Sequence, residues 1–164
     1  MAQELSKIEI AGLYTEIPEL FGPTCRGVAG AVSYNWNGWL SAVGDISGCK
    51  GSAPSGFLLF SPGPTSTTTH TWFTYMAGPR VSYRRRLTPY AHVLFGGAHA
   101  NNDNSFSVFK GNAFAMTIGA GVDLRVSGRV AIRLIQPEYL RSDFGSGLVR
   151  EDMRIQSGVV FRLK

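Results

Sequence analysis

The feature that most constrains the fold is a strict alternation of short and long connections between eight segments of alternating polarity. In each segment one of the two alternating sets of residues is mostly apolar, and this period of two predicts a β-strand with one apolar face. The segments are residues 7–14, 28–35, 40–48, 72–84, 90–98, 113–125, 130–140 and 153–164. Short turns are expected at residues 35–38, 85–87 and 127–128, and the other connections are long. This order places all the long loops at one end of the sheet.

The composition fits strands that cross a bilayer. Charged residues make up only 16% of the chain, below the ~25% of a typical soluble domain. Mean hydropathy is nevertheless only +0.01, and the longest apolar run, at residues 57–60, is far shorter than the ~18 residues of a spanning helix. In a transmembrane barrel the mean hydropathy is intermediate in this way, because apolar lipid-facing residues alternate with polar lumen-facing ones. The sequence therefore predicts an all-β fold, an eight-stranded antiparallel up-and-down transmembrane β-barrel with short periplasmic turns.

The length predicts one barrel domain over residues 1–164, with residues 1–6 as a flexible N-terminus. The opening Met1-Ala2-Gln3-Glu4 lacks the apolar core of a signal peptide, so we expect a mature exported form with an added initiator Met. No basic helix or RNA-binding aromatic motif accompanies the net charge of +5, which argues against nucleic acid as a partner. The arginines at 84–86 are expected in a solvated turn or near anionic lipid head groups.

The last strand carries a pattern of its own. Gln156, Gly158, Phe161 and Leu163 follow the order polar-x-Gly-x-x-apolar-x-apolar at the end of the sequence. This pattern resembles the C-terminal strand signal by which bacterial outer-membrane barrels are recognised for insertion. The resemblance implies that the barrel-assembly machinery binds this strand. Lys164 departs from it, because many such proteins end on the aromatic or apolar residue itself.

Further stretches extend the resemblance to the whole chain from Lys7. They are GPRVSYR at 78–84, TPYAH at 88–92, FGGA at 95–98, NAFAM at 112–116 and GVVFR at 158–162. With them the chain is similar to the OmpA-like eight-stranded outer-membrane barrel domain family. The resemblance implies a multi-pass protein of a Gram-negative outer membrane, with the lipid bilayer as its main partner, and we expect a monomer. Two-domain members carry a peptidoglycan-binding domain after the barrel, which has no counterpart in this sequence.

Six charged residues have the inward-facing parity of their strands. A charge inside a narrow barrel is costly unless it is paired. We therefore expect a lumen charge network whose ion pairs plug the barrel. The alternative is a gate that opens a small ion pore when the pairs exchange. The members of the predicted network are Glu9, Asp45, Arg80, Asp123, Arg133 and Arg154.

The two cysteines, Cys25 and Cys49, are predicted to form a disulfide. A turn centred on Asn37 would pair residues whose numbers add up to 74, which places the cysteines directly opposite each other and Tyr34 opposite Leu40. Both cysteines share the parity of the lumen face, and the periplasm and cell surface are oxidising. The alternative is two free thiols one turn apart.

Catalysis is an alternative interpretation of the histidines. Lipid-A-modifying barrels that resemble PagL need a nucleophilic serine beside a histidine, but His70, His92 and His99 have no serine two residues away. We expect His92 to be hydrogen-bonded in the lumen. Residues 101–104 lack the spacing of a calcium loop, and no helix pattern follows the glycines at 119–121. We therefore expect no enzymatic activity, no cofactor and no metal.

Aromatic residues gather near the predicted strand ends, as the interfacial girdles of a transmembrane barrel do. A soluble lipocalin-like barrel that binds an apolar ligand, the other alternative, would point its aromatics inward. The predicted function is an integral outer-membrane barrel with a structural, surface-interaction or minor-permeability role. The expected girdles are Tyr34, Trp36, Trp39, Tyr83, Tyr90 and Phe161 at the short turns, and Tyr14, Trp72, Phe73, Phe114 and Tyr139 at the long loops.

Overall fold

The computed structural model describes residues 6–18, 24–55, 66–104, 107–145, 147 and 149–163. They form eight antiparallel strands that close into one barrel in chain order, with the first strand paired to the last. This confirms the predicted up-and-down β-barrel. Within these ranges no helix is long and apolar enough to cross a membrane. The strands are β1 (Ile8–Ile17), β2 (Cys25–Asn35), β3 (Leu40–Ser55), β4 (Ser66–Ser82), β5 (Leu87–Asn104), β6 (Ser107–Arg125), β7 (Val130–Asp143) and β8 (Val149–Leu163).

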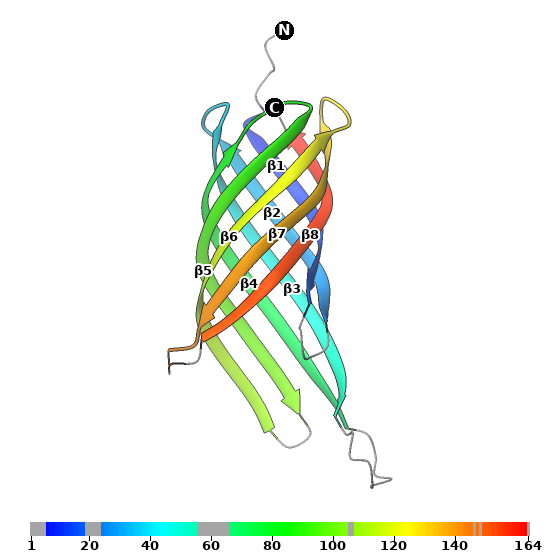
Figure 1. The fold of residues 1–164 in the computed structure, drawn as a ribbon, viewed down its shortest axis with the longest axis vertical. Coiled ribbons are helices and arrows are strands. Elements are labelled where there is room, and N and C mark those ends of the chain that lie inside the picture. Colours follow the sequence, from blue (N-terminus) through cyan, green and yellow to red (C-terminus); the bar gives the residue numbers. More distant parts are fainter. Residues whose placement is uncertain are drawn as a thin grey trace.

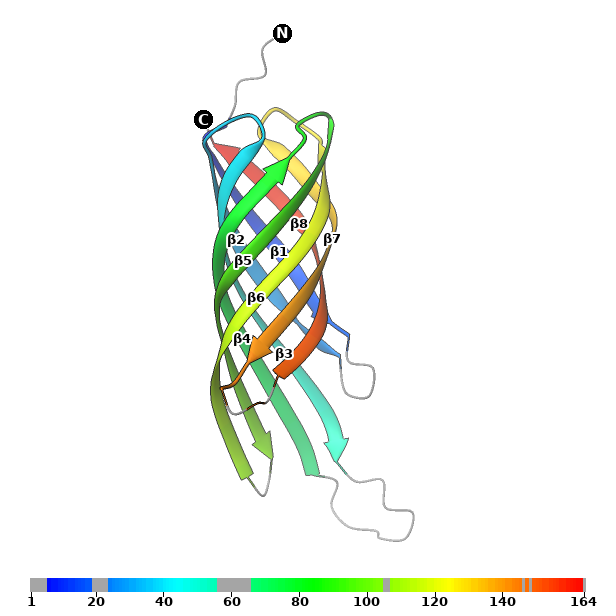
Figure 2. The same ribbon diagram turned by 60° about the vertical axis from the view of Figure 1, so that its left-hand side comes forward.

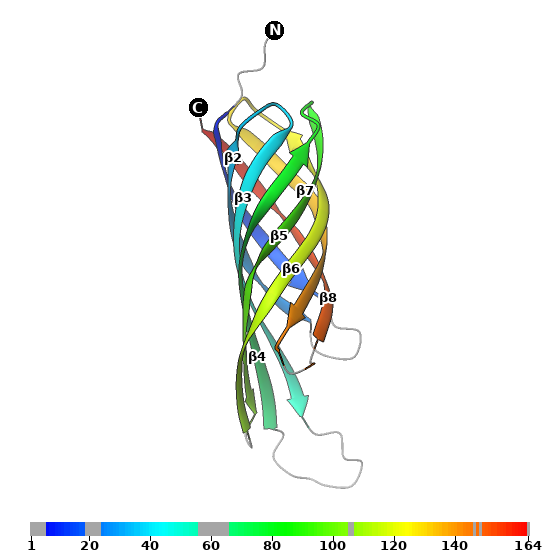
Figure 3. The same ribbon diagram turned by 90° about the vertical axis from the view of Figure 1, so that its left-hand side faces the viewer.

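The short turns and the long connections lie at opposite ends of the barrel (Figure 1). Residues 36–39, 83–86 and 126–129 join consecutive strands at the end where β1 begins and β8 ends. At the other end, β3 with β4 and β5 with β6 run past the ends of the remaining strands (Figure 2 and Figure 3). We call the two ends the short-turn end and the long-loop end.

The residues that alternate in the sequence lie on the two faces of the barrel wall. In β1, Ala11 and Leu13 point inward and are 6% and 4% exposed, whereas Ile10 and Tyr14 point outward and are 43% and 47% exposed. Successive side chains of a strand point to opposite faces of the sheet, so each strand contributes to both surfaces. Because the barrel closes, each strand has a partner on both sides within the barrel, as a structure inside a bilayer requires.

The strands are longer at the long-loop end than the sequence predicts. The predicted loop at residues 99–111 instead forms a ladder between β5 and β6 that ends with the pair Asn104–Ser107. β3 and β4 pair as far as Ser55 and Ser66. Their backbone groups bond to each other whatever the side chains are, so polar residues do not end the hairpins. The apolar run at residues 57–60 lies outside the described residues.

The hairpin between β2 and β3 has a different register from the predicted one. Tyr34 pairs with Ala42 rather than Leu40, so paired numbers add up to 76 instead of 74. The turn is wider than expected, because the Leu40 carbonyl accepts hydrogen bonds from the amides of Trp36 and Asn37 at 3.1 and 3.3 Å. A shift of two residues leaves every side chain on its predicted face.

The Cys25–Cys49 disulfide is present, with 5.5 Å between the Cα atoms. The predicted position directly across the ladder is wrong, because Cys49 pairs with Gly27 and the disulfide runs diagonally. A Cβ on Gly27 would meet the carbonyl oxygen of Gly48, so only glycine permits this close approach of the strands. The disulfide links β2 and β3 on the lumen face, near the long-loop end.

Irregularities interrupt some of the ladders. The β4–β5 pairing has a gap between the pairs Ala77–Phe95 and Arg80–His92, at Pro79, which has no amide hydrogen to donate. A β-bulge in β7 lies between Arg133 and Gln136.

The bulge lets two successive apolar residues, Leu134 and Ile135, both face outward at 48% exposure. Gln136 then returns to the lumen, and Tyr139 faces outward as expected.

Candidate functional site

The interior of the barrel holds a set of charged side chains with very low exposure. Each comes from the inward parity of its strand, and together they come from β1, β3, β4, β6, β7 and β8. None is more than 5% exposed. The structure places all the predicted members inside the barrel: Glu9, Asp45, Arg80, Asp123, Arg133 and Arg154.

The central cluster consists of His92, Glu138, Arg154 and Asp45. His92 Nε2 lies 2.8 Å from Glu138 Oε1, and Arg154 Nε donates to Glu138 Oε2. Arg154 Nη2 lies 3.3 Å from Asp45 Oδ1, and Nη1 donates to Ser47 Oγ at 2.7 Å. Arg154 therefore contacts two carboxylates at once. His92 is a hydrogen-bonded lumen residue, in agreement with the prediction.

A second group, made of Asp123, Arg133 and Gln136, joins the central cluster. Arg133 contacts both oxygens of Asp123, with Nε to Oδ1 at 2.8 Å and Nη2 to Oδ2 at 3.1 Å. Its Nη1 donates to Gln136 Oε1 at 2.8 Å. The Gln136 amide nitrogen lies 2.6 Å from Glu138 Oε1 and 2.8 Å from Gln156 Oε1. The hydrogen-bonded contacts are thus continuous from Asp123 to the central cluster.

The short-turn end of the lumen is arranged around Glu9. Glu9 Oε1 lies 3.1 Å from Arg84 Nη1 and 3.3 Å from Arg162 Nε. Arg80 lies nearby but differs from the other buried arginines. Among the residues that the structure describes, no carboxylate forms an ion pair with it, which departs from the expectation that every lumen charge is paired.

Small residues of β6 leave room for the lumen side chains. A Cβ on Gly119 would lie 2.6 Å from Cγ of Glu138 and 2.9 Å from Nε2 of His92. A Cβ on Gly121 would meet the hydroxyl of Tyr90. Larger residues at these two positions would therefore displace the ion pair or the aromatic ring.

Sequence reasoning missed several lumen residues. Glu138 has the same parity as Leu140 and alternates with the outward Tyr139, and this signal was enough to place it inside. Tyr90 and Trp72 were predicted in the aromatic girdles, and that prediction is wrong, because they are 5% and 8% exposed. Tyr90 lies on the same face of its strand as His92, and Trp72 lies on the same face as Thr74. Both faces point inward. The Tyr90 ring lies between two guanidinium groups, with Arg80 Cζ at 4.4 Å and Arg133 Cζ at 4.8 Å from its centroid.

The other histidines lie away from this network. His99 Nδ1 lies 2.6 Å from Asn112 Oδ1 at an exposed position. His70 is half-buried in β4, near the long-loop end, and pairs with Asn102 of β5. Within the described ranges, no group of three or more His, Cys, Asp or Glu residues is placed to hold a metal ion.

The predicted insertion signal is divided between the two faces of β8. Phe161 and Leu163 face outward and are 51% and 46% exposed, whereas Gln156 is fully buried in the lumen. Gly158 lies against β1, where a Cβ would meet the carbonyl oxygen of Gly12. The glycine of the pattern is therefore required where β8 packs closely against β1 to close the barrel.

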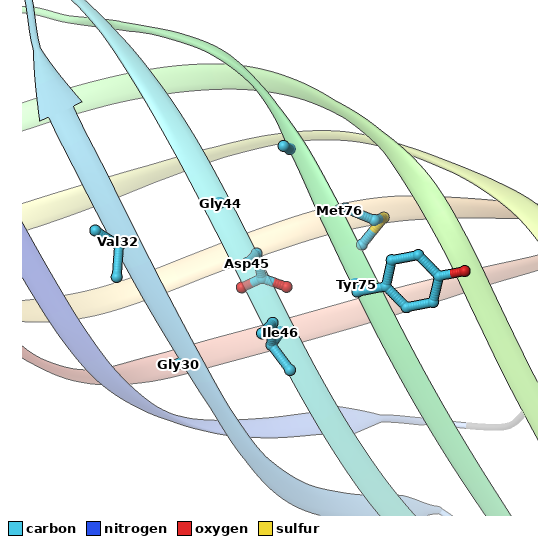
Figure 4. A pocket seen from close by; sticks show the side chains of 8 residues that line it. Gly30, Val32, Gly44, Asp45, Ile46, Tyr75 and Met76 are labelled. Carbon is cyan, nitrogen blue, oxygen red and sulfur yellow. The ribbon is translucent and has the colours of Figure 1, made fainter.

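A shallow hollow of about 370 Å³ lies on the outer face of β2, β3 and β4. Gly30 and Gly44 form its floor because they lack side chains, and Val32, Ile46 and Tyr75 flank it (Figure 4). Asp45 also lines this region, but its carboxylate belongs to the lumen, where it contacts Arg154. The outward side chains of the hollow offer no nucleophile or ion pair.

No family model matches the sequence, and a comparison with curated proteins finds no match. Solved structures share the fold. Ail, the attachment invasion locus protein of Yersinia pestis, has a TM-score of 0.62 at 15% identity, with 95% of this chain and 96% of that chain covered. Neisserial surface protein A has a TM-score of 0.62 at 13% identity, with 95% and 96% covered. The N-terminal β-barrel domain of Pseudomonas aeruginosa OprF has a TM-score of 0.58 at 13% identity, with 94% and 95% covered.

At these identities the likeness is one of fold. The interior with its buried ion pairs, the apolar exterior and the closed antiparallel ladder define the class: an eight-stranded transmembrane β-barrel with the fold of bacterial outer-membrane barrels. The family named from the sequence motifs has this same architecture.

Proposed function

We propose that the protein is an integral, multi-pass protein of the bacterial outer membrane with a structural or surface-interaction role and a largely plugged lumen. The observation that carries this proposal is the apolar outer face. Soluble monomers rarely expose a contiguous apolar patch beyond roughly 300–600 Å². Here large apolar side chains on every strand are exposed, among them Tyr14, Val28, Ile46, Tyr75, Phe95, Ile118, Leu134 and Phe161.

Aromatic residues at the short-turn end support the placement of the barrel across a membrane. Tyr34, Trp36, Trp39 and Tyr83 are 47–60% exposed around this end. Amphipathic rings at such a position match the head-group level of a bilayer. The short-turn end then faces the periplasm, and the extended hairpins of β3–β4 and β5–β6 face outward from the cell.

The lumen contacts support a barrel that is closed to most solutes. The central cluster and the Asp123–Arg133–Gln136 group bond to each other across the interior. Eight strands make a barrel that side chains nearly fill. Minor permeability would require these ion pairs to exchange partners, so we regard conductance as secondary to a structural or surface role.

Two other functions find less support. In the part of the chain that the structure describes, no histidine is hydrogen-bonded to a serine hydroxyl, which a lipid-A hydrolase of the serine–histidine type requires. A soluble carrier of apolar ligands needs an apolar interior, whereas this interior holds ion pairs. We therefore infer no enzymatic activity and no cofactor.

The lipid bilayer is the proposed main partner, and the protein is proposed to act as a monomer. The outward Phe161 and Leu163 of β8 support recognition of this strand by the barrel-assembly machinery. Replacing both by Ser should reduce the amount assembled in cells. Replacing Val28 and Val32 of β2 by Ser removes outward apolar side chains from a different strand and serves as the control.

Heat-modifiable gel mobility tests the proposal. The protein is folded into liposomes and run on denaturing gels with and without boiling, and β-type circular dichroism is recorded alongside. We expect the unboiled sample to migrate as a distinct, faster band and the protein to fractionate with the outer membrane in cells. A stable, folded monomer in buffer without detergent or lipid would contradict the membrane assignment.

A further inference from the structure

A small cavity of about 10 Å³ lies in the lumen at the short-turn end. It is near the lower limit of about 10–15 Å³ for one water-sized sphere. Charged and hydroxyl-bearing residues line it, among them three arginines and two carboxylates. The lining residues are Glu9, Arg80, Ser82, Arg84, Thr88, Tyr90, Asp123 and Arg162.

Both carboxylates of this lining are already engaged by other arginines. Glu9 contacts Arg84 and Arg162 through one oxygen, at 3.1 and 3.3 Å. Asp123 uses both oxygens for Arg133, at 2.8 and 3.1 Å. Among the described residues, neither acid forms an ion pair with Arg80.

Arg80 is the buried cation that this arrangement leaves without a counter-ion. Arg80 is only 3% exposed, and its Nε has no hydrogen-bond partner in the described part of the chain. Nη1 donates to Ser33 Oγ at 3.3 Å, and the guanidinium lies 4.4 Å from the centroid of the Tyr90 ring. A neutral hydroxyl and an aromatic face offset only part of the cost of burying a charge.

We propose that a monatomic, monovalent anion of the chloride class binds in this cavity beside Arg80. One negative charge would offset the charge of Arg80, for which the described residues supply no ion-paired carboxylate, and the Arg80 Nε–H would donate a charge-assisted hydrogen bond to the anion. The hydroxyl-bearing Ser82 and Thr88 line the same space. Phosphate and sulfate are too large for a cavity of about 10 Å³.

The first test compares unfolding in chloride and in gluconate at constant ionic strength, with the protein folded in detergent micelles. Gluconate is too large for the cavity, so general screening is the same and only site binding differs. We expect the folded-to-unfolded ratio to rise by up to about tenfold for each tenfold increase in chloride above the dissociation constant. Equal stability in the two salts would overturn the proposal.

Variants localise the effect. Arg80→Gln should abolish the chloride dependence, because the uncompensated charge is gone. Arg86→Gln removes an exposed arginine from the same end and should retain the dependence in full. If Arg80→Gln responds to chloride as the unsubstituted protein does, the site is not at Arg80 and the proposal fails.

Bromide diffraction on the unsubstituted protein provides a test that needs no variant. Crystals grown or soaked in bromide should show an anomalous peak within hydrogen-bond distance of Arg80 Nε. The absence of a peak there would overturn the proposal, even if Arg80→Gln does not fold. This inference rests on the lumen geometry alone, so it can fail while the outer-membrane role stands.

Discussion

The lumen face and the outer face of the barrel are built from the same strands, yet they are stabilised in opposite ways. Thr117 and Ile118 are neighbours in β6, but Thr117 is 0% exposed inside the lumen and Ile118 is 50% exposed on the outside. The lumen face holds charged side chains with specific partners, such as Arg154 with Glu138 and Asp45. The outer face has few partners within the protein and needs lipid to cover it.

The difference predicts where substitutions are tolerated. On the outer face, one apolar residue can replace another, because lipid chains adapt to either shape. In the lumen, even an isosteric change leaves a buried group without its partner. The largest effects are therefore expected at ion-paired lumen residues, and the smallest at exposed ion pairs near the long-loop end.

Glu138→Gln is expected to have the largest effect. It removes the carboxylate shared by Arg154 and His92, leaving Arg154 with Asp45 alone. Breaking a buried ion pair lowers the free energy of unfolding by about 3–5 kcal/mol. Urea unfolding in detergent micelles, followed by tryptophan fluorescence, measures the change.

The same variant tests whether the network closes the lumen. In planar bilayers the unsubstituted protein should be nearly silent, and Glu138→Gln should show more frequent or larger conductance events. Unfolding curves and recordings that both match the unsubstituted protein would mean that the lumen charges are solvated independently.

Ile118→Arg tests the outer face. An arginine near the bilayer midplane should lower stability by roughly 2–4 kcal/mol, measured by folding into liposomes. Ile118→Leu is the matched control and should fold normally. Leu163→Arg, on the same face but at the end of β8, should cost only about 0–1 kcal/mol. Equal tolerance of arginine at the two positions would contradict the assigned depth and facing.

The disulfide adds a covalent link to the lumen face. Its cysteines are 24 residues apart, and closing a loop of this size stabilises by about 3 kcal/mol in the chain-entropy model. Reduction and Cys25→Ser should therefore lower the unfolding midpoint by similar amounts. Mass spectrometry of the unreduced protein, cleaved between the cysteines, should detect one linked peptide pair, and two free thiols would contradict the assignment.

Glu151→Gln should have the smallest effect. Glu151 lies 3.8 Å from Arg141 at the long-loop end, and the two side chains are about half exposed, at 52% and 51%. Exposed ion pairs contribute about 0–1 kcal/mol. A loss comparable to that of Glu138→Gln would show that the contrast between buried and exposed pairs is wrong.

Much of the fold could be predicted from the sequence because side-chain facing depends only on parity. The facing of Phe114 to Leu124 in β6 and the inward position of Arg133 and Arg154 follow from counting by two. The β2–β3 register could not be predicted in this way, because a turn two residues wider leaves every side chain on the same face of its strand. The polar extension of β5 and β6 was missed, because backbone pairing leaves no hydrophobic pattern in residues such as Asn101.

The partners within the lumen could not be predicted, because they depend on which strands face each other across the barrel. Glu138 and Arg154 are neighbours on β7 and β8, whereas Asp45 reaches Arg154 from β3. The cost of burying an unpaired charge led us to expect that every lumen charge is paired. This expectation failed for Arg80, since the nearby acids Glu9 and Asp123 are already engaged by other arginines.

A nitroxide scan of β6 tests the two-faced barrel most directly. Positions 114–124 are replaced one at a time by a spin-labelled cysteine, with Cys25 and Cys49 changed to Ser, and oxygen accessibility is measured in liposomes. High accessibility is expected at Phe114, Met116, Ile118, Ala120 and Val122, with low accessibility at the positions between them. A uniform profile, or an alternation of the opposite phase, would contradict a barrel whose apolar face meets lipid.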